Sequence, residues 1–430
     1  MQRPRRVSQN TSMVQERVLS RMRRIAVLCT SAGPCLILSA CIGGSSTSGA
    51  LSPPPPTSNV VAVTVDSGPA AAAGQINHAY VTVKVCVSGS STECASIDHV
   101  RLDTGSTGLR LVRSVLASQK IALLSETDAS ARTIEECMSF AGGQTWGPIA
   151  QADIYLAGES ASKVPVQIMD DTASGAPPPA GCGANGTLIN GVDGFGANGV
   201  LGLGVLLQDC GESCASGAAA GSSYYGCTAA GSCTAENVAL GSQVTNPVAL
   251  FATDNNGLIV KLPNLANANG DPTVQGELIF GLATQSDNAL PATALTVLGA
   301  DTSGRFLATY KGAQMPALID SGMDSYAFSD PSIPSCSSGL FIGYYCPAVA
   351  PQAESAVNTG VGVNNGSGTV DFAIADPNTF VAGATAFIDL AGGGGATTFT
   401  WGLPFFYGRA VYLGLAQRTV GIYTGPFYAY

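Results

Sequence analysis

The stretches HVRLDTGSTG (residues 99–108) and PALIDSG (residues 316–322) end in the same pattern. Each closes an apolar, strand-like run with an Asp, followed by a hydroxyl residue and a Gly that permits a tight turn. One copy is weak evidence, but two copies far apart in the chain allow each half of a two-lobed protein to donate one carboxylate. Because neighbouring carboxyl groups cannot easily both ionise, one keeps its proton while the other acts as a base toward water.

Composition agrees with a folded, turn-rich β protein. The 430 residues are 46% hydrophobic and include 53 Gly and 24 Pro, which disfavour long helices. A net charge of −10 argues against nucleic acid as a partner, and two His leave little material for a His-rich metal site. Alternation of apolar with polar residues predicts strands at 80–87, 152–157, 164–169, 257–262, 276–281, 306–310 and 384–390. No amphipathic helix of ordinary length stands out, and the best short helix candidates are 113–125 and 350–358.

Further landmarks accompany the two Asp motifs in a fixed order. They are NGVLGL (198–203), GELIFG (276–281), FTWGLP (399–404) and the strand-rich segment 409–423. Together with the Asp motifs they resemble the pepsin-like aspartic proteases. The segments LDTGSTGLR (102–110) and GLPFFYG (402–408) are similar still more closely to an uncharacterised group of bacterial lipoproteins. The resemblance implies an all-β, bilobal architecture of two β-barrel-like lobes with a cleft between them.

The resemblance also implies roles for the residues of the two motifs. Asp103 and Asp320 would form the catalytic pair that binds and activates water. Thr104 and Ser321 would brace the two loops through hydroxyl-to-backbone hydrogen bonds. Ser106 would orient the outer oxygen of Asp103, and the remaining loop-supporting residues are Gly105 and Gly322.

Two departures from the family pattern bear on activity. The counterpart of Ser106 in the second motif is Met323, which has no hydroxyl. In the family, the hairpin that covers the cleft carries a Tyr, whereas here that stretch contains Phe140 and Trp146, which supply a ring without a phenol and an indole donor at a shifted position.

These features favour an aspartic endopeptidase that acts on peptides or proteins, without a cofactor or metal, as a monomer. The intact Asp motifs support this function. The alternative is a catalytically inactive pepsin-fold envelope lipoprotein that binds peptide or another ligand in the same cleft, which Met323 and the altered flap support.

The N-terminal segment predicts export and lipid anchoring. Arg23 and Arg24 precede a short apolar run that ends in LSAC (38–41), which resembles a lipoprotein signal, so Cys41 is the expected lipidation site. A conventional signal cut nearby is the alternative, and translation starting at Met22 would already supply a complete leader. The predicted organisation is a signal peptide (1–41), a tether (42–59), an N-terminal lobe (60–255) and a C-terminal lobe (256–430). The expected location is the bacterial cell envelope, anchored in the outer membrane.

Cysteine usage agrees with an oxidising compartment. Beyond Cys41 the chain has ten cysteines, an even number suited to disulfides, and no His near the Cys-rich segment 210–233 to favour zinc. Cys86 with Cys94, and Cys336 with Cys346, are expected to close short loops. The pairing of the others stays open: Cys137, Cys182, Cys210, Cys214, Cys227 and Cys233.

Overall fold

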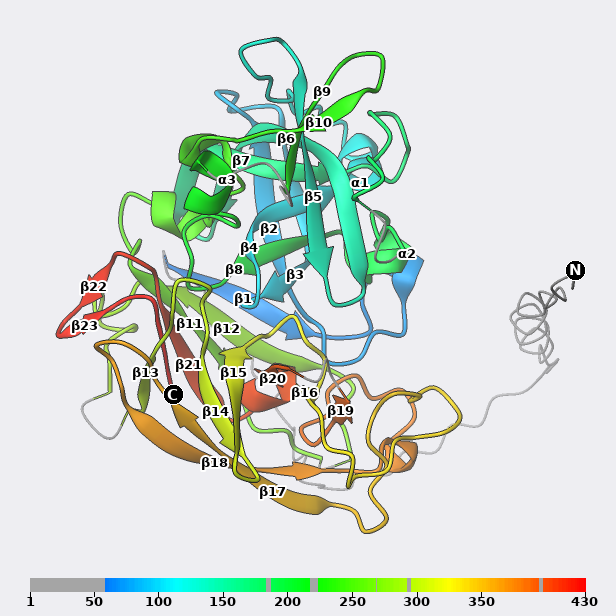
Figure 1. Cartoon of the computed structure of the whole chain (residues 1–430), viewed down its shortest axis with the longest axis vertical. Coiled ribbons are helices and arrows are strands. Elements are labelled where there is room, and N and C mark those ends of the chain that lie inside the picture. Colours follow the sequence, from blue (N-terminus) through cyan, green and yellow to red (C-terminus); the bar gives the residue numbers. More distant parts are fainter. Residues whose placement is uncertain (1–58, 183–186, 217–222, 268, 292–294, 394–396) are drawn as a thin grey trace, which may run out of the picture. The chain divides into compact units, whose positions relative to one another are not determined.

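The computed structural model describes residues 59–430 except for gaps at 183–186, 217–222, 268, 292–294 and 394–396 (Figure 1). Contacts divide the chain into two units, 1–52 and 53–430, and every described residue belongs to the second. The predicted leader, Cys41 and residues 42–58 of the tether therefore lie outside the described residues. No helix in the described part of the chain is long and apolar enough to cross a membrane.

The first half of the described chain is built from strands with short helices between them. The strands are β1 (Val60–Val65), β2 (Ala79–Val87), β3 (Cys94–Asp103), β4 (Thr107–Val112), β5 (Thr133–Phe140), β6 (Gly143–Leu156), β7 (Glu159–Met169), β8 (Gly199–Leu203), β9 (Tyr224–Cys227) and β10 (Cys233–Ala235). The helices are η2 (Ala70–Ala72), α1 (Arg113–Ser118), α2 (Val192–Phe195), α3 (Glu212–Ser216), η3 (Leu240–Ser242) and η4 (Pro247–Leu250).

The second half contains many more strands than helices. The strands are β11 (Gly257–Leu262), β12 (Val274–Phe280), β13 (Val297–Gly299), β14 (Phe306–Tyr310), β15 (Ala313–Ile319), β16 (Tyr326–Phe328), β17 (Gln352–Thr359), β18 (Ser367–Ile374), β19 (Ala391–Gly393), β20 (Phe399–Trp401), β21 (Arg409–Gly414), β22 (Thr419–Val420), β23 (Tyr423–Thr424) and β24 (Phe427–Ala429). The helices are η5 (Pro377–Thr379) and η6 (Leu403–Phe406).

These strands form two main groups joined by a central layer. Strands β2–β10 gather in one half and β14–β20 in the other, while β1, β12, β11 and β21 lie side by side between them (Figure 1). In this central layer β1 pairs with β12 from Val60↔Ile279 to Val65↔Val274. The predicted all-β, bilobal architecture is thus confirmed, whereas the lobe boundary at residue 255 stays a prediction.

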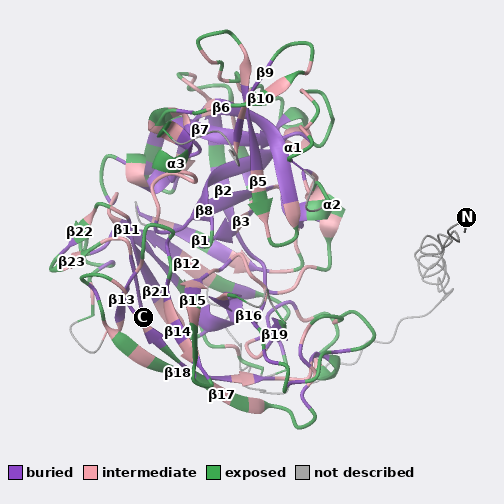
Figure 2. Cartoon of the chain, viewed as in Figure 1, coloured by how far each residue is buried: buried purple, intermediate pink, exposed green. Residues whose placement is uncertain are grey.

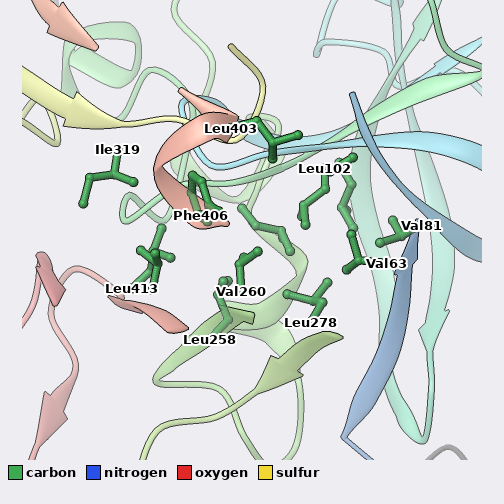
Figure 3. Close-up of a cluster of buried hydrophobic side chains, with 14 of the residues drawn as sticks. Val63, Val81, Leu102, Leu258, Val260, Leu278, Ile319, Leu403, Phe406 and Leu413 are labelled. Atoms are coloured by element: carbon green, nitrogen blue, oxygen red, sulfur yellow. The ribbon is translucent and has the colours of Figure 1, made fainter. Parts of the chain in front are cut away.

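Apolar side chains on the inner faces of these strands form the main core. Val63 of β1, Leu102 of β3, Val260 of β11, Leu278 of β12 and Leu413 of β21 are all fully buried (Figures 2 and 3). Burying one such side chain contributes roughly 1.5–3 kcal/mol. Strands from both halves contribute to this cluster. It includes Leu102 and Ile319, the residues that directly precede Asp103 and Asp320.

Three segments differ from the sequence prediction. Residues 384–390 are not a strand, because the Phe387 amide donates to the side chain of Asn77, far away in the sequence, and not to the backbone of a neighbouring strand. The helix predicted at 350–358 is strand β17, since continuous pairing with β18 outweighs local helix propensity. The helix predicted at 113–125 ends at Ser118, and Lys120 then takes a left-handed conformation with φ 59°.

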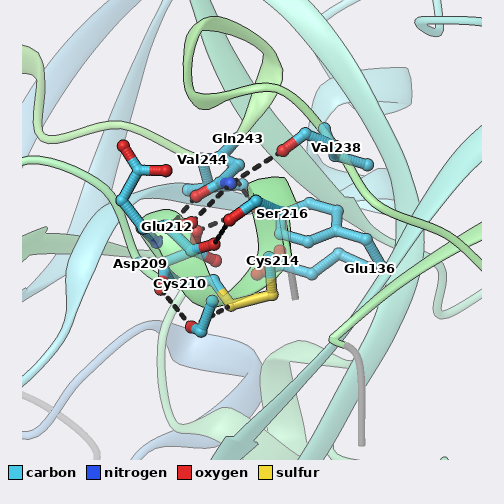
Figure 4. Close-up of a disulfide and its surroundings, with 12 residues drawn as sticks. Glu136, Asp209, Cys210, Glu212, Cys214, Ser216, Val238, Gln243 and Val244 are labelled. Atoms are coloured by element: carbon cyan, nitrogen blue, oxygen red, sulfur yellow. Dashed lines mark hydrogen bonds between the residues drawn. A yellow bond between two sulfur atoms is a disulfide. The ribbon is translucent and has the colours of Figure 1, made fainter. Parts of the chain in front are cut away.

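The expectation of disulfides is confirmed. All ten cysteines of the described residues pair: Cys86–Cys94, Cys137–Cys182, Cys210–Cys214, Cys227–Cys233 and Cys336–Cys346. The two local loops predicted from spacing are among them. Figure 4 shows the Cys210–Cys214 bridge, which lies beside Asp209 and Glu136 in the first half.

Candidate active site

The two Asp motifs lie at equivalent places in two similar strand arrangements. Strand β3 ends at Asp103 and runs parallel to β8, which in turn pairs antiparallel with β4. Strand β15 ends directly before Asp320 and runs parallel to β20, which pairs antiparallel with β16. Each Asp thus lies at the end of an apolar strand, where the chain turns.

Buried hydroxyl groups join the two turns. The Thr104 amide donates to Ser321 Oγ over 3.1 Å, and the Ser321 amide donates to Thr104 Oγ1 over 2.9 Å. Each hydroxyl also donates to the opposite strand, Thr104 to the Ile319 carbonyl and Ser321 to the Leu102 carbonyl. The geometry therefore has the reciprocal form that the resemblance implies for these two residues.

Glycines allow the two carboxyl groups to approach. A Cβ placed on Gly105 would lie 2.3 Å from the Asp320 Cγ, and a Cβ placed on Gly322 would lie 2.6 Å from the Asp103 Cγ. Both spacings are shorter than any tolerated contact between carbon atoms. Each motif thus needs its glycine to make room for the aspartate of the other.

The two carboxyl groups have unequal partners. Asp103 accepts hydrogen bonds from the Gly105 amide at 2.8 Å and from Ser106 Oγ at 2.7 Å. Asp320 accepts from the Gly322 amide at 2.8 Å, and Met323 offers no hydroxyl to it. Burial raises the pKa of Asp320 well above its usual value, and the neighbouring charge of Asp103 raises it further. These effects favour the protonated form of Asp320.

A cavity of about 300 Å³ opens beside this pair. Its lining includes both aspartates, Met323, and the tip of the β5–β6 hairpin, Phe140 to Gly142. The ring of Phe140 packs edge-on against Phe195, with ring centroids 5.2 Å apart. The hairpin tip is therefore part of the cavity lining, where a covering flap is expected.

The structure does not bring Trp146 to this cavity. Trp146 is buried, its indole N–H donates to the Ala176 carbonyl at 2.7 Å, and its ring packs against Tyr225 near the Cys137–Cys182 bridge. Its donor is therefore already occupied. Phe140 contributes to the cavity, and Trp146 supports the base of the hairpin.

Four polar residues near the aspartates were not recognised in the sequence. Arg101 and His78 line the same cavity, and Arg101 donates a hydrogen bond to the Gly322 carbonyl across the cleft. Tyr344 donates to Asp324 at 2.5 Å, where a second cavity of about 380 Å³ adjoins the first. Of these four residues, only Arg101 could have been noticed in the sequence, because it is a charged residue among the apolar residues that precede Asp103.

Asn77 forms buried hydrogen bonds with the loop that follows Asp320. Its side-chain amide donates to the Asp324 carbonyl at 2.7 Å and to the Phe387 carbonyl at 2.8 Å, and its oxygen accepts from Tyr407 at 2.9 Å. The side chain is fully buried.

Among the described residues, no group of three or more His, Cys, Asp or Glu side chains is arranged to hold a metal ion.

Comparison with known proteins finds a matching family model and similar solved structures. A family model described as "Protein of unknown function (DUF3443)" matches residues 55–430. No curated protein matches the chain. Among solved structures, the crystal structure of an aspartic proteinase from Irpex lacteus is similar, with 14% sequence identity and a TM-score of 0.43. The match covers 86% of this chain and 96% of that chain.

Proposed function

The chain belongs to the DUF3443 family, whose function is unknown, and from the geometry of its cleft we propose that it is an aspartic endopeptidase. One observation carries the proposal: the reciprocal Thr104–Ser321 hydrogen bonds set the carboxyl groups of Asp103 and Asp320 opposite each other. A pair held in this way can share one proton and bind a water between its oxygens.

In the proposed mechanism, Asp103 is the general base. Its two hydrogen-bond donors favour its charged form, whereas Asp320 keeps its proton. Asp103 takes a proton from the water as the water oxygen attacks the peptide carbonyl, while Asp320 donates its proton to the developing oxyanion. The C–N bond of the tetrahedral intermediate then breaks: Asp103 gives its proton to the leaving amine nitrogen, while a hydroxyl of the intermediate returns a proton to Asp320. The pair therefore again holds one proton.

A second candidate is a peptide-binding protein without turnover. Met323 favours it, because the loop of Asp320 lacks the hydroxyl that Ser106 supplies to Asp103. Digestion of a mixed peptide library by the full chain, with and without a statine inhibitor, distinguishes the two candidates. Cleavage of internal bonds that statine blocks supports the enzyme, whereas statine binding without cleavage supports the binding protein.

We further propose that the protein works in the bacterial cell envelope as a lipid-anchored monomer. The five disulfides support an oxidising compartment, and the LSAC segment at 38–41 supports lipidation of Cys41. The change Cys41→Ala is expected to release the chain from washed membranes into the soluble fraction. Retention of this variant in membranes would contradict the anchor.

A further inference from the structure

Arg101 places a positive charge in the cavity beside the two aspartates. It lies on β3, two residues before Asp103, and one of its terminal nitrogens donates to the Gly322 carbonyl. Its Nε is buried and has no hydrogen-bond partner, and its guanidinium forms no salt bridge within the described residues. Its charge opposes the rise in the pKa of Asp320 that burial causes, but no carboxylate of the described residues forms an ion pair with it. A cation that is partly withdrawn from water and lacks an ion pair favours an anionic occupant.

His78 lines the same cavity and is 7% exposed. Its Nδ1 has no hydrogen-bond partner of normal geometry. Burial and the charge of Arg101 hold the pKa of His78 well below its usual value, which favours the neutral ring. A neutral imidazole can donate a hydrogen bond to a ligand beside Arg101, and it does not form an ion pair with the guanidinium group.

The remaining lining gives this cavity apolar walls. Phe140, Ile189 and Phe195 belong to the lining together with Arg101. Such walls suit the methylene groups of a side chain whose polar end reaches Arg101. A long acidic side chain has this combination of apolar stem and anionic end.

Two other acidic residues line the cavity and must be compared with Arg101. Asp324 accepts a hydrogen bond from Tyr344, and both residues also line the second cavity. Asp193 is exposed, and one of its oxygens accepts from the Gly194 amide. These partners are neutral groups, a phenol and a backbone amide. Arg101 is the one Lys or Arg in the described lining of this cavity, so it is the group there that can form an ion pair with a carboxylate of a substrate.

We propose that this cavity selects a carboxylate at the substrate residue next to the cleaved bond, with Arg101 as the specificity-determining residue. The inference rests on the proposed peptidase function. For an endopeptidase the carboxylate belongs to an Asp or Glu side chain. A free C-terminus would form the same charge-assisted hydrogen bonds with the guanidinium group, and the cleaved bond would then be the last one of the peptide.

The test begins from a peptide that the parent protein cleaves. Versions with blocked ends carry Glu, Gln or Lys at each residue flanking the cleaved bond, and a further pair carries Gln with a free or an amidated C-terminus. The parent, Arg101→Gln, Arg101→Glu and the control Arg305→Gln are compared at pH 6, where Glu is ionised. Arg305 is an exposed arginine outside the cavity lining, so its change removes the same charge elsewhere.

The parent is expected to cleave the Glu peptide about tenfold faster in kcat/KM than the Gln peptide. Arg101→Gln should reduce this ratio to about one, Arg101→Glu should favour Lys, and Arg305→Gln should keep the ratio of the parent. Because each ratio is taken within one variant, a general loss of activity cancels. The parent can instead cleave the peptide with a free C-terminus faster than the amidated one. If Arg101→Gln removes that difference, the site is supported, with the C-terminal carboxylate as its ligand.

The inference and the proposed function can fail separately. Cleavage in which the parent does not distinguish Glu from Gln, or in which Arg101→Gln keeps the preference, overturns the carboxylate site and leaves the peptidase. If no peptide is cleaved, the same peptides are titrated by fluorescence anisotropy. Glu-selective binding that Arg101→Gln removes then supports the site and overturns the peptidase, and absence of selective binding overturns both.

Discussion

Thr104 and Ser321 each donate a backbone amide to the hydroxyl of the other, at 3.1 and 2.9 Å. Each hydroxyl then donates to a carbonyl on the strand that leads into the opposite loop, at Ile319 and Leu102. Four hydrogen bonds thus connect two turns that are far apart in the sequence. The connection is buried, so water cannot replace a lost partner easily.

Removal of either hydroxyl should therefore destabilise the fold. We expect Thr104→Val and Ser321→Ala each to lower the free energy of unfolding by about 1–3 kcal/mol, because buried amides lose their acceptors. The double variant should lose less than the sum, since both changes break one network. Urea unfolding measures this, with Ser118→Ala on the surface as the control. Additive losses would show that the two residues act independently.

Replacement of Met323 tests the asymmetry of the aspartates. A hydroxyl in Met323→Thr that donates to Asp320 would favour its charged form and lower its raised pKa. The alkaline limb of kcat/KM, where Asp320 loses its proton, should then move to lower pH, and Met315→Thr, which lies outside the cavity, should leave it in place. An alkaline limb that stays fixed or moves upward in Met323→Thr would contradict this assignment.

Particular residues show how far the sequence could lead. The paired Asp motifs and the landmark segments 198–203 and 399–404 carried the resemblance that implied the two-lobed β architecture. The place of Trp146 was not readable, since its partners Ala176 and Tyr225 come from other segments. The same holds for His78 and Tyr344, whose nearness to the aspartates depends on how the loops pack.

Burial of Glu135 should make stability depend on pH. Burial raises the pKa of Glu135 to about 8, Arg113 opposes this rise, and Asp170 adds to it. The folded state therefore binds a proton that the unfolded chain releases above about pH 4.5, and this contribution is lost as pH rises toward 8. We expect Glu135→Gln to match the parent at pH 4 and to exceed it at pH 8 by up to a few kcal/mol.

Thermal unfolding from pH 4 to 9 measures this difference between parent and variant. The control is Glu93→Gln, which changes an exposed carboxylate. A constant difference across this range would show that Glu135 titrates normally in the folded protein.

The disulfides should stabilise the fold in proportion to the loops they close. The Cys137–Cys182 bridge spans 45 residues and the Cys210–Cys214 bridge spans 4. On a chain-entropy model, replacing both cysteines of each pair by Ser should cost about 4 and about 2 kcal/mol, respectively. Denaturant unfolding of the two double variants compares them directly. An equal or reversed order would indicate that local packing, not loop closure, determines the loss.

The central claim is that Asp103 and Asp320 together activate water. The most direct measurement is the initial rate of cleavage of one peptide by the parent, Asp103→Asn and Asp320→Asn, with circular dichroism to verify folding. The parent should cleave and be blocked by statine, while each folded Asn variant should lose about 10³-fold or more in rate. Cleavage by either variant at the parental rate would contradict the two-aspartate mechanism, and a folded parent that neither cleaves nor binds statine would contradict the peptidase itself.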